Sequence, residues 1–174
     1  MNTISDLARA YHFAAVKHVD QRRKGDAAEP YMNHLTEVAE LVATATNGDD
    51  IDVVIAAVLH DAVEDTNATL DELEKSFGSR ISSLVAEVTD DKSLPKATRK
   101  LLQIEHAAQA SLGAKIIKLA DKTANLRTLA ASPPSDWSLA RRNEYVTWAQ
   151  QVADRCRGTN AWLEAEFDRA ASAL

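Results

Sequence analysis

Cysteine, glycine and proline are scarce in this 174-residue chain, which has one Cys, five Gly and four Pro. The single thiol, Cys156, has no partner for an internal disulfide, and so few Gly and Pro exclude collagen-like and low-complexity chains. The first residues lack the basic and then apolar stretch of a signal peptide, and no apolar run reaches the roughly 18–20 residues that span a membrane. These absences predict a compact protein of a reducing, cytoplasmic compartment, with no part in a membrane.

Positive charge is also in short supply. Twenty Lys and Arg stand against 26 Asp and Glu, so the net charge is −6. This balance argues against a nucleic acid as partner, because binding along its backbone depends on many distributed cations. The densest positive run, Arg22, Arg23 and Lys24, can still bind a phosphate group. The alternative for this run is a solvated helix end whose cations complement the helix dipole.

Nearly every segment has helical periodicity, and the chain has the length of one domain. We therefore predict an all-α, single-domain helical bundle over residues 1–174. The expected helices cover residues 5–22, 31–46, 53–65 with Asp50 as N-cap, 70–77 with a Thr69–Glu72 capping box, 79–88, 96–110, 114–131, 138–155 and 159–173.

Residues 60–65, His-Asp-Ala-Val-Glu-Asp, follow directly on the apolar run 53–59. Burying such polar groups costs several kcal/mol each unless they are paired or coordinated to a metal. On a helix, His60 and Glu64, like Asp61 and Asp65, are four residues apart and project from one face, so the four groups are expected to share a cavity. The alternative is that Glu64 and Asp65 are solvated residues at the helix end.

Two more polar residues lie on apolar helix faces, His34 in segment 31–46 and Asp121 in segment 114–131. His34 alone is more often a hydrogen-bonded core histidine than a ligand. Together with His60 and Asp61, however, His34 and Asp121 form a set of two imidazoles and two carboxylates. Such a set suits a divalent ion of intermediate hardness. Mn²⁺ or Fe²⁺ fits best, with Zn²⁺ or Mg²⁺ as alternatives; a structural zinc site would be richer in thiolates.

Four stretches resemble the HD-domain metal-dependent phosphohydrolases, whose signature is a histidine, a His-Asp pair and a distant aspartate. They are residues 21–24 with 30–34, 59–66, 88–96, and 118–122 with 125–127. The likeness is greatest to the hydrolase domain of the RelA/SpoT group, especially its small stand-alone members of the metazoan SpoT homologue type. It implies an HD-type fold and a metal-dependent hydrolase that removes the 3′-pyrophosphate of ppGpp and pppGpp. Removal of the 2′-phosphate of NADPH is the alternative, and no synthetase activity is expected.

The resemblance also implies roles for individual residues. Glu64 and Asp65 would hold or deprotonate the attacking water. Substrate contacts are implied for Arg23, Lys24, Lys96, Asn125, Arg141 and Tyr145. The guanidinium fork and the lysine point charge of Arg23 and Lys24 together suit a pyrophosphate, and Asn125 would touch the sugar or base. The alternative for Asn125 is a polar residue near a helix end.

Other functions stay open at this point. Another nucleotide phosphohydrolase could use the same metal set. An alarmone sensor that binds without hydrolysis has no need of the Glu64–Asp65 pair, and a helical adaptor would leave the buried polar set unexplained. Trp137, Trp148 and Trp162 are expected to be packing or interface residues. The partners expected are a small nucleotide and, as an open alternative, a second copy of the chain in a homo-oligomer.

Overall fold

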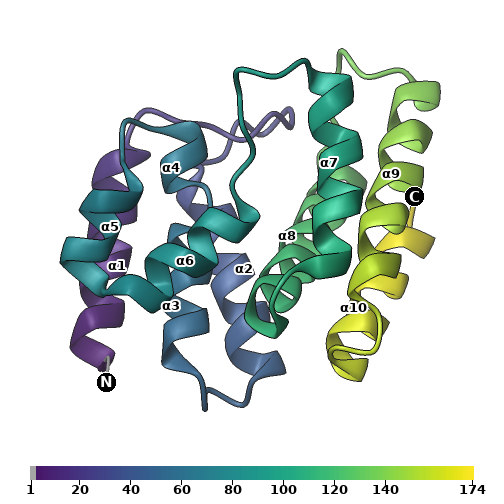
Figure 1. The fold of residues 1–174 in the computed structure, drawn as a ribbon. Coiled ribbons are helices and arrows are strands. Elements are labelled where there is room, and N and C mark those ends of the chain that lie inside the picture. Colours follow the sequence, from purple (N-terminus) through teal and green to yellow (C-terminus); the bar gives the residue numbers. More distant parts are fainter. Residues whose placement is uncertain (1–2) are drawn as a thin grey trace.

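The computed structural model describes residues 3–174, and all regular elements in that range are helices (Figure 1). The prediction of an all-α fold is therefore confirmed. The helices are α1 (Ile4–Lys17), α2 (Met32–Ala45), α3 (Ile51–Leu59), α4 (Ala62–Asp65), α5 (Leu70–Phe77), α6 (Ser79–Val88), α7 (Lys96–Gln109), α8 (Leu112–Ala131), α9 (Leu139–Cys156) and α10 (Ala161–Ser172).

The centre of the bundle is formed by α2, α3 and α8. Every residue from 53 to 59 is buried, as expected for a helix that is apolar on all sides, and α3 packs against α1, α2, α6 and α8. Figure 1 shows α1 and α5 on one side of this centre and α7, α9 and α10 on the other. Cys156 at the end of α9 is a buried free thiol. The polar residues that interrupt this core therefore come from its best-packed helices.

The first helix ends five residues earlier than the sequence predicts. α1 stops at Lys17, and the following segment turns back on itself. The backbone N–H of Tyr31 donates to the carbonyl of Gln21 at 3.0 Å, and that of Arg23 donates to Glu29 at 2.8 Å. These bonds replace the helical ones, because each backbone group can enter only one regular pattern. The resulting loop, residues 18–31, folds over the end of α8.

The prediction of one continuous helix through residues 53–65 is also wrong. α3 ends at Leu59, and α4 is a separate turn that begins after Asp61, whose backbone has φ −96° and ψ −3°. The Nδ1 atom of His60 lies 2.8 Å from the carbonyl oxygen of Ala57, so the side chain folds back onto α3. The break changes the direction of the chain at His60 and Asp61, but Asp65 stays close to Asp61, since its backbone N–H donates to the Asp61 carbonyl oxygen at 2.8 Å.

Two predicted helix N-caps are found at the expected positions, but they do not form all of the expected hydrogen bonds. Thr69 caps α5 by accepting from the N–H of Glu72 at 3.1 Å, whereas the Glu72 carboxylate pairs with Lys17 at 3.0 Å. Asp50 precedes α3 as expected, and its carboxylate pairs with Arg80 at 2.6 Å. The carboxylates of Glu72 and Asp50 therefore form ion pairs with other helices and do not cap their own.

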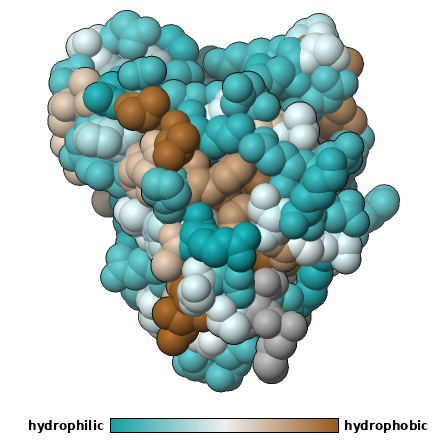
Figure 2. Space-filling model, turned by 90° about the vertical axis from the view of Figure 1, so that its left-hand side faces the viewer, coloured by the Kyte–Doolittle hydropathy of each residue, from teal (hydrophilic) through white to brown (hydrophobic). Residues whose placement is uncertain are grey.

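Apolar side chains at the surface are dispersed. Figure 2 shows the side that α1 and α5 form, where separate brown patches interrupt a mostly hydrophilic surface. The exposed large apolar residues are Ile4, Val16, Val19, Leu101, Leu112, Leu139, Trp162 and Leu174. Most of them lie singly on different helices, and Val19 and Leu174 lie outside the helices. Single exposed apolar residues are normal in folded proteins. None of the helices in residues 3–174 is both long and apolar enough to cross a bilayer.

Candidate metal centre and adjoining cavity

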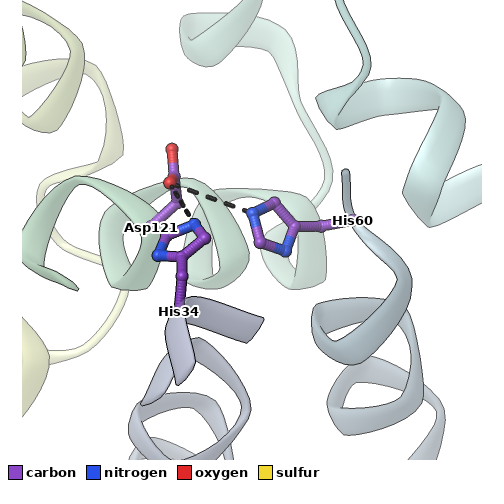
Figure 3. Close-up of side chains that lie close together, drawn as sticks. All are labelled: His34, His60 and Asp121. Atoms are coloured by element: carbon purple, nitrogen blue, oxygen red, sulfur yellow. Dashed lines mark ion pairs between the residues drawn. The ribbon is translucent and has the colours of Figure 1, made fainter. Parts of the chain in front are cut away.

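Three parts of the core bring the four expected metal ligands together. His34 comes from α2, His60 and Asp61 from the break between α3 and α4, and Asp121 from the middle of α8. The Nε2 atom of His34 lies 3.3 Å from Asp121 Oδ1 and 3.6 Å from Asp61 Oδ2, and His60 Nε2 lies 3.1 Å from Asp61 Oδ2. Figure 3 shows both imidazoles turned toward the Asp121 carboxylate. His34, His60 and Asp121 each offer a ligand atom, all within 4.8 Å of one another.

The hydrogen bonds of His60 test whether this set fits a cation. Its Nδ1 atom faces the Ala57 carbonyl oxygen, which can only accept, so Nδ1 carries a proton. Its Nε2 atom is buried, has no hydrogen-bond partner and points toward two carboxylates. A backbone carbonyl that fixes the ring in this way is the usual support of a metal-binding histidine. The donor set therefore fits a divalent metal ion.

The charges of the centre also favour a cation. Burial opposes ionisation of Asp61 and Asp121, but His60 near the first and Lys122 near the second outweigh it and hold the pKa of both carboxyls well below the usual range. Burial likewise disfavours charge on His60, yet the Asp61 and Asp121 charges raise its pKa to about 9. Both carboxylates therefore remain ionised, and the pair attracts positive charge.

Three residues hold the two carboxylates in place: Lys122 and Tyr31, which the sequence did not single out, and Asn125, which was expected to contact substrate. Lys122 Nζ lies 2.7 Å from Asp121 Oδ2, while the Asn125 amide donates to Asp121 Oδ1 at 2.6 Å. The Tyr31 hydroxyl donates to Asp61 Oδ2 at 2.5 Å and also lies 3.3 Å from Asp65 Oδ2. The contact of Asn125 with Asp121 follows the i,i+4 spacing of a helix. No spacing rule predicts the other contacts, because Lys122 is adjacent to Asp121 on the helix and Tyr31 belongs to another segment.

Glu64 and Asp65 lie at the end of α4, but they are not fully solvated. Their side chains are 18% and 26% exposed. The Glu64 carboxylate accepts from the Asp90 N–H at 3.0 Å, but burial and nearby acidic groups raise its pKa to about 7. Asp65 forms a close ion pair with Lys92, another residue that sequence reasoning did not select. Glu64 is therefore poised to exchange a proton near neutral pH.

A cavity of about 540 Å³ opens beside the metal centre. Its lining includes four of the six residues expected to bind substrate, namely Arg23, Lys24, Asn125 and Tyr145, together with Asp65 and Lys92. Lys96 and Arg141 are not in the lining. Arg141 lies at the border, with its guanidinium carbon 4.4 Å from the centre of the Trp137 ring. Trp137 lines the cavity and its ring packs against that of Tyr145, with centroids 5.7 Å apart.

The cationic edge of the cavity is held by a close approach between two segments. Arg23 donates to the Thr128 hydroxyl on α8 at 2.6 Å. A Cβ atom on Gly25 would lie 2.4 Å from the carbonyl oxygen of Ser132, so only glycine fits at this position. The contact presses the loop of residues 18–31 onto the end of α8 and places Arg23 and Lys24 at the mouth of the cavity.

Comparison with known proteins agrees with this geometry. The HD-domain family profile matches residues 10–156. The guanosine-3′,5′-bis(diphosphate) 3′-pyrophosphohydrolase MESH1 of Drosophila melanogaster is 50% identical over 156 residues, which cover 90% of this chain and 87% of the relative. The protein of the same name from Homo sapiens is 51% identical over 160 residues, covering 92% and 89%.

A solved structure described as a metazoan ortholog of SpoT that hydrolyses ppGpp superposes with a TM-score of 0.93 at 46% identity. The match covers 98% of this chain and 96% of that one. With its fold, its histidine and aspartate set and its sequence all in agreement, the chain belongs to the HD-domain family, in the group of small SpoT-like hydrolases.

Proposed function

We propose that this chain is a metal-dependent hydrolase that removes the 3′-pyrophosphate of ppGpp and pppGpp. The observation that carries the proposal is the buried, unpartnered Nε2 of His60 among two carboxylates and a second imidazole, next to a cavity with Arg23 and Lys24 at its edge. The relatives named for this reaction match nearly the whole chain and support the same substrate.

His34, His60, Asp61 and Asp121 would hold one divalent ion. Two imidazoles and two carboxylates are ligands of intermediate hardness, and we propose Mn²⁺ as the native ion, with Fe²⁺, Zn²⁺ and Mg²⁺ as alternatives. When bound, such an ion lowers the pKa of a water molecule and offsets negative charge on the phosphoryl group. Lys122 and Asn125 keep the Asp121 carboxylate in one orientation, and Tyr31 does the same for Asp61.

Glu64 and Asp65 would handle the proton of the attacking water. Because the pKa of Glu64 is raised to about 7, its carboxylate can accept a proton during attack and return it to the ribose 3′ oxygen as that oxygen leaves. The new bond joins the water oxygen to the pyrophosphate, and the broken bond frees the ribose 3′ oxygen. Asp65 lines the cavity and is linked through Tyr31 to Asp61, so it can hold the water in line.

The cations around the cavity would bind the phosphate groups. Arg23 offers a planar fork and Lys24 a point charge at the same edge, a pair that suits a pyrophosphate. Asn125 and Tyr145 also line the cavity, and there we place the nucleoside; Arg141 and Lys96, which do not line it, would act farther out. The net charge of −6 makes such a local cluster necessary for attracting a polyanion.

Three broader predictions accompany this function. We propose that residues 1–174 act as one domain, since helices from α1 to α10 contribute to one apolar core. We also propose a reducing, cytoplasmic compartment, in keeping with the free thiol of Cys156. Formation of a homo-oligomer stays a prediction.

The test is a nucleotide panel with purified, metal-loaded protein. ppGpp should yield GDP and pyrophosphate, and pppGpp should yield GTP and pyrophosphate, with kcat/KM values above those for NADPH and other nucleotides. A preference for NADPH would move the function to a 2′-phosphatase. Tight binding of ppGpp without turnover would make the chain a sensor.

A further inference from the structure

His18 is a buried histidine that none of the roles above uses. It lies just after α1, its residue is 2% exposed, and it is outside the set of metal ligands. Its Nδ1 atom is 2.6 Å from the side-chain oxygen of Gln21, and its Nε2 atom is buried without a partner. A buried polar side chain with one unsatisfied nitrogen costs stability, so its presence in the core suggests a functional role.

The hydrogen bonds of Gln21 fix the proton on His18. The Gln21 amide nitrogen donates to the backbone carbonyl oxygen of Asp65 at 2.5 Å. Because that carbonyl can only accept, the amide oxygen must be the atom that faces His18, and an amide oxygen can only accept as well. His18 therefore carries its proton on Nδ1. A one-way series of hydrogen bonds results, from His18 through Gln21 to Asp65.

His18 also reaches Asp65 by a second route. Its ring stacks on the Tyr31 ring, with centroids 5.2 Å apart and planes 18° apart. The Tyr31 hydroxyl is the group that lies 2.5 Å from Asp61 Oδ2 and 3.3 Å from Asp65 Oδ2. Gln21 thus bonds to the backbone of Asp65, and Tyr31 contacts the Asp65 carboxylate. Gln21 and Tyr31 are both in contact with His18. Asp65 is held where α4 ends, and α4 itself is only one turn long.

We infer that His18 is a positioning residue for the proposed hydrolysis, which sets Asp65 through Gln21 and Tyr31. The inference rests on the proposed function, because Asp65 is assigned there to hold the attacking water. His18 is itself neither a metal ligand nor part of the lining of the cavity, which it contacts only through Gln21 and Tyr31. Asp65, which it would position, is assigned to the water and not to binding of the substrate. The effect of His18 should therefore fall on kcat, with KM for ppGpp within twofold of the parent value.

Two substitutions separate the two routes. In His18→Asn the side-chain amide nitrogen takes the place of Nδ1 and can still donate to Gln21, but the ring that packs on Tyr31 is lost. In His18→Phe the ring is kept and the donor is lost. We expect kcat to fall about tenfold in His18→Phe, and less in His18→Asn, because small misplacements of a reacting group lower rates steeply. The melting temperature should rank in the opposite order, since Phe fills the buried site and Asn leaves a void.

A purely structural role would not give opposite rank orders for kcat and for the melting temperature, because a less stable variant would then also be the less active one. If kcat follows the melting temperature, or if folded His18→Phe keeps kcat within twofold, the inference is wrong. The matched controls are His12→Asn and His12→Phe, since His12 is exposed on α1. In a double-mutant cycle, His18→Phe should add little to the loss caused by Gln21→Ala, and full additivity would contradict a route through Gln21.

An NMR measurement keeps the inference testable without catalysis. In ¹⁵N-labelled protein, the ring nitrogen shifts of His18 should report a proton on Nδ1, and Gln21→Ala should abolish that preference. A proton on Nε2 in the parent protein would overturn the assignment whether or not ppGpp is hydrolysed. Absence of hydrolysis by a parent protein with the Nδ1 proton would instead contradict the proposed function alone.

Discussion

The metal centre and the cavity beside it are held by different means. The centre is formed by side chains of core elements, and the side chain of His34 is only 1% exposed. The cationic edge comes from a loop and from long side chains at the surface, where those of Lys92 and Arg141 are 48% and 44% exposed. Packing fixes the ligands before any ion binds, whereas the cations can adjust to a phosphate group. Under the proposed function, the core would therefore determine the type of reaction and the edge the choice of substrate.

The largest expected effect is at the metal centre. Asp121→Asn keeps the size of the side chain but removes a charge from the ligand set. We expect kcat/KM for ppGpp to fall by about 1,000-fold, because the ion supplies several kcal/mol of transition-state stabilisation. Metal analysis should show about one equivalent of divalent ion per parent chain and a small fraction of this in the variant. Asp71→Asn, an exposed change on α5, serves as control; normal metal content in Asp121→Asn would contradict the assignment.

The next effect is expected at Glu64, to which the proposed function assigns the transfer of a proton. Because its carboxyl group must be ionised to accept a proton, and its pKa is raised to about 7, the parent kcat should fall as pH drops below about 7. Glu64→Gln should lower kcat at pH 8 by about 100-fold and remove this acidic limb. Rates on ppGpp between pH 5.5 and 9 provide the measurement. A limb that survives in the variant would transfer the role of base to Asp65.

At the edge of the cavity the effects should be smaller and should fall on KM. Lys24 lines the cavity and Lys96 does not. A charge-assisted hydrogen bond contributes about 1.5–3 kcal/mol, so Lys24→Ala should raise KM for ppGpp roughly 10- to 100-fold. Lys96→Ala should raise it by less than about threefold, like other exposed charges. Steady-state kinetics measures the KM of both variants, with Lys75→Ala as control. Equal effects at Lys24 and Lys96 would mean that lining the cavity does not decide which lysine binds the substrate.

The same contrast explains what could be predicted from the sequence. His60 and Asp61 follow an apolar run, and His34 and Asp121 interrupt apolar helix faces. The sequence alone therefore shows that these polar groups are buried at a cost in free energy. The residues that surround them show no such signal. Lys92 and Tyr31 reach Asp65 from separate segments, and their contacts depend on how loops 89–95 and 18–31 fold. These positions follow from tertiary packing, which periodicity does not encode.

The ends of two helices were predicted wrongly for a related reason. Residues 18–22 and 60–61 carry no helix-breaking glycine or proline, so their sequence permits a continuous helix. In the fold, α1 gives way to the loop that carries Arg23, and α3 gives way to the turn that aims His60 and Asp61. Local propensity is overridden at both points where the chain must supply functional groups.

The smallest expected effect is on stability, and it also concerns Glu64. The pKa of Glu64 is about 7 in the folded protein and near 4.5 when unfolded, so the folded state binds more protons between these values. Stability should therefore decline as pH rises from 4.5 to 7, and the full penalty should persist above pH 7. Glu64→Gln removes that penalty. After allowance for partial solvent exposure, the metal-free variant should be more stable than the parent by about 1 kcal/mol at pH 8.

Chemical denaturation of metal-free protein at pH 4.5 and pH 8 measures this difference. The two proteins should have similar stability at pH 4.5, because Glu64 is then protonated in the folded state and carries no charge to penalise. Glu87→Gln is a control on α6, since Glu87 is exposed and its carboxylate accepts from Ser111 near the start of α8. A gain for Glu64→Gln that is equal at both pH values would mean that packing, not charge, separates the variants. A gain confined to pH 8, together with lost activity, would mean that Glu64 is kept ionised at the expense of stability.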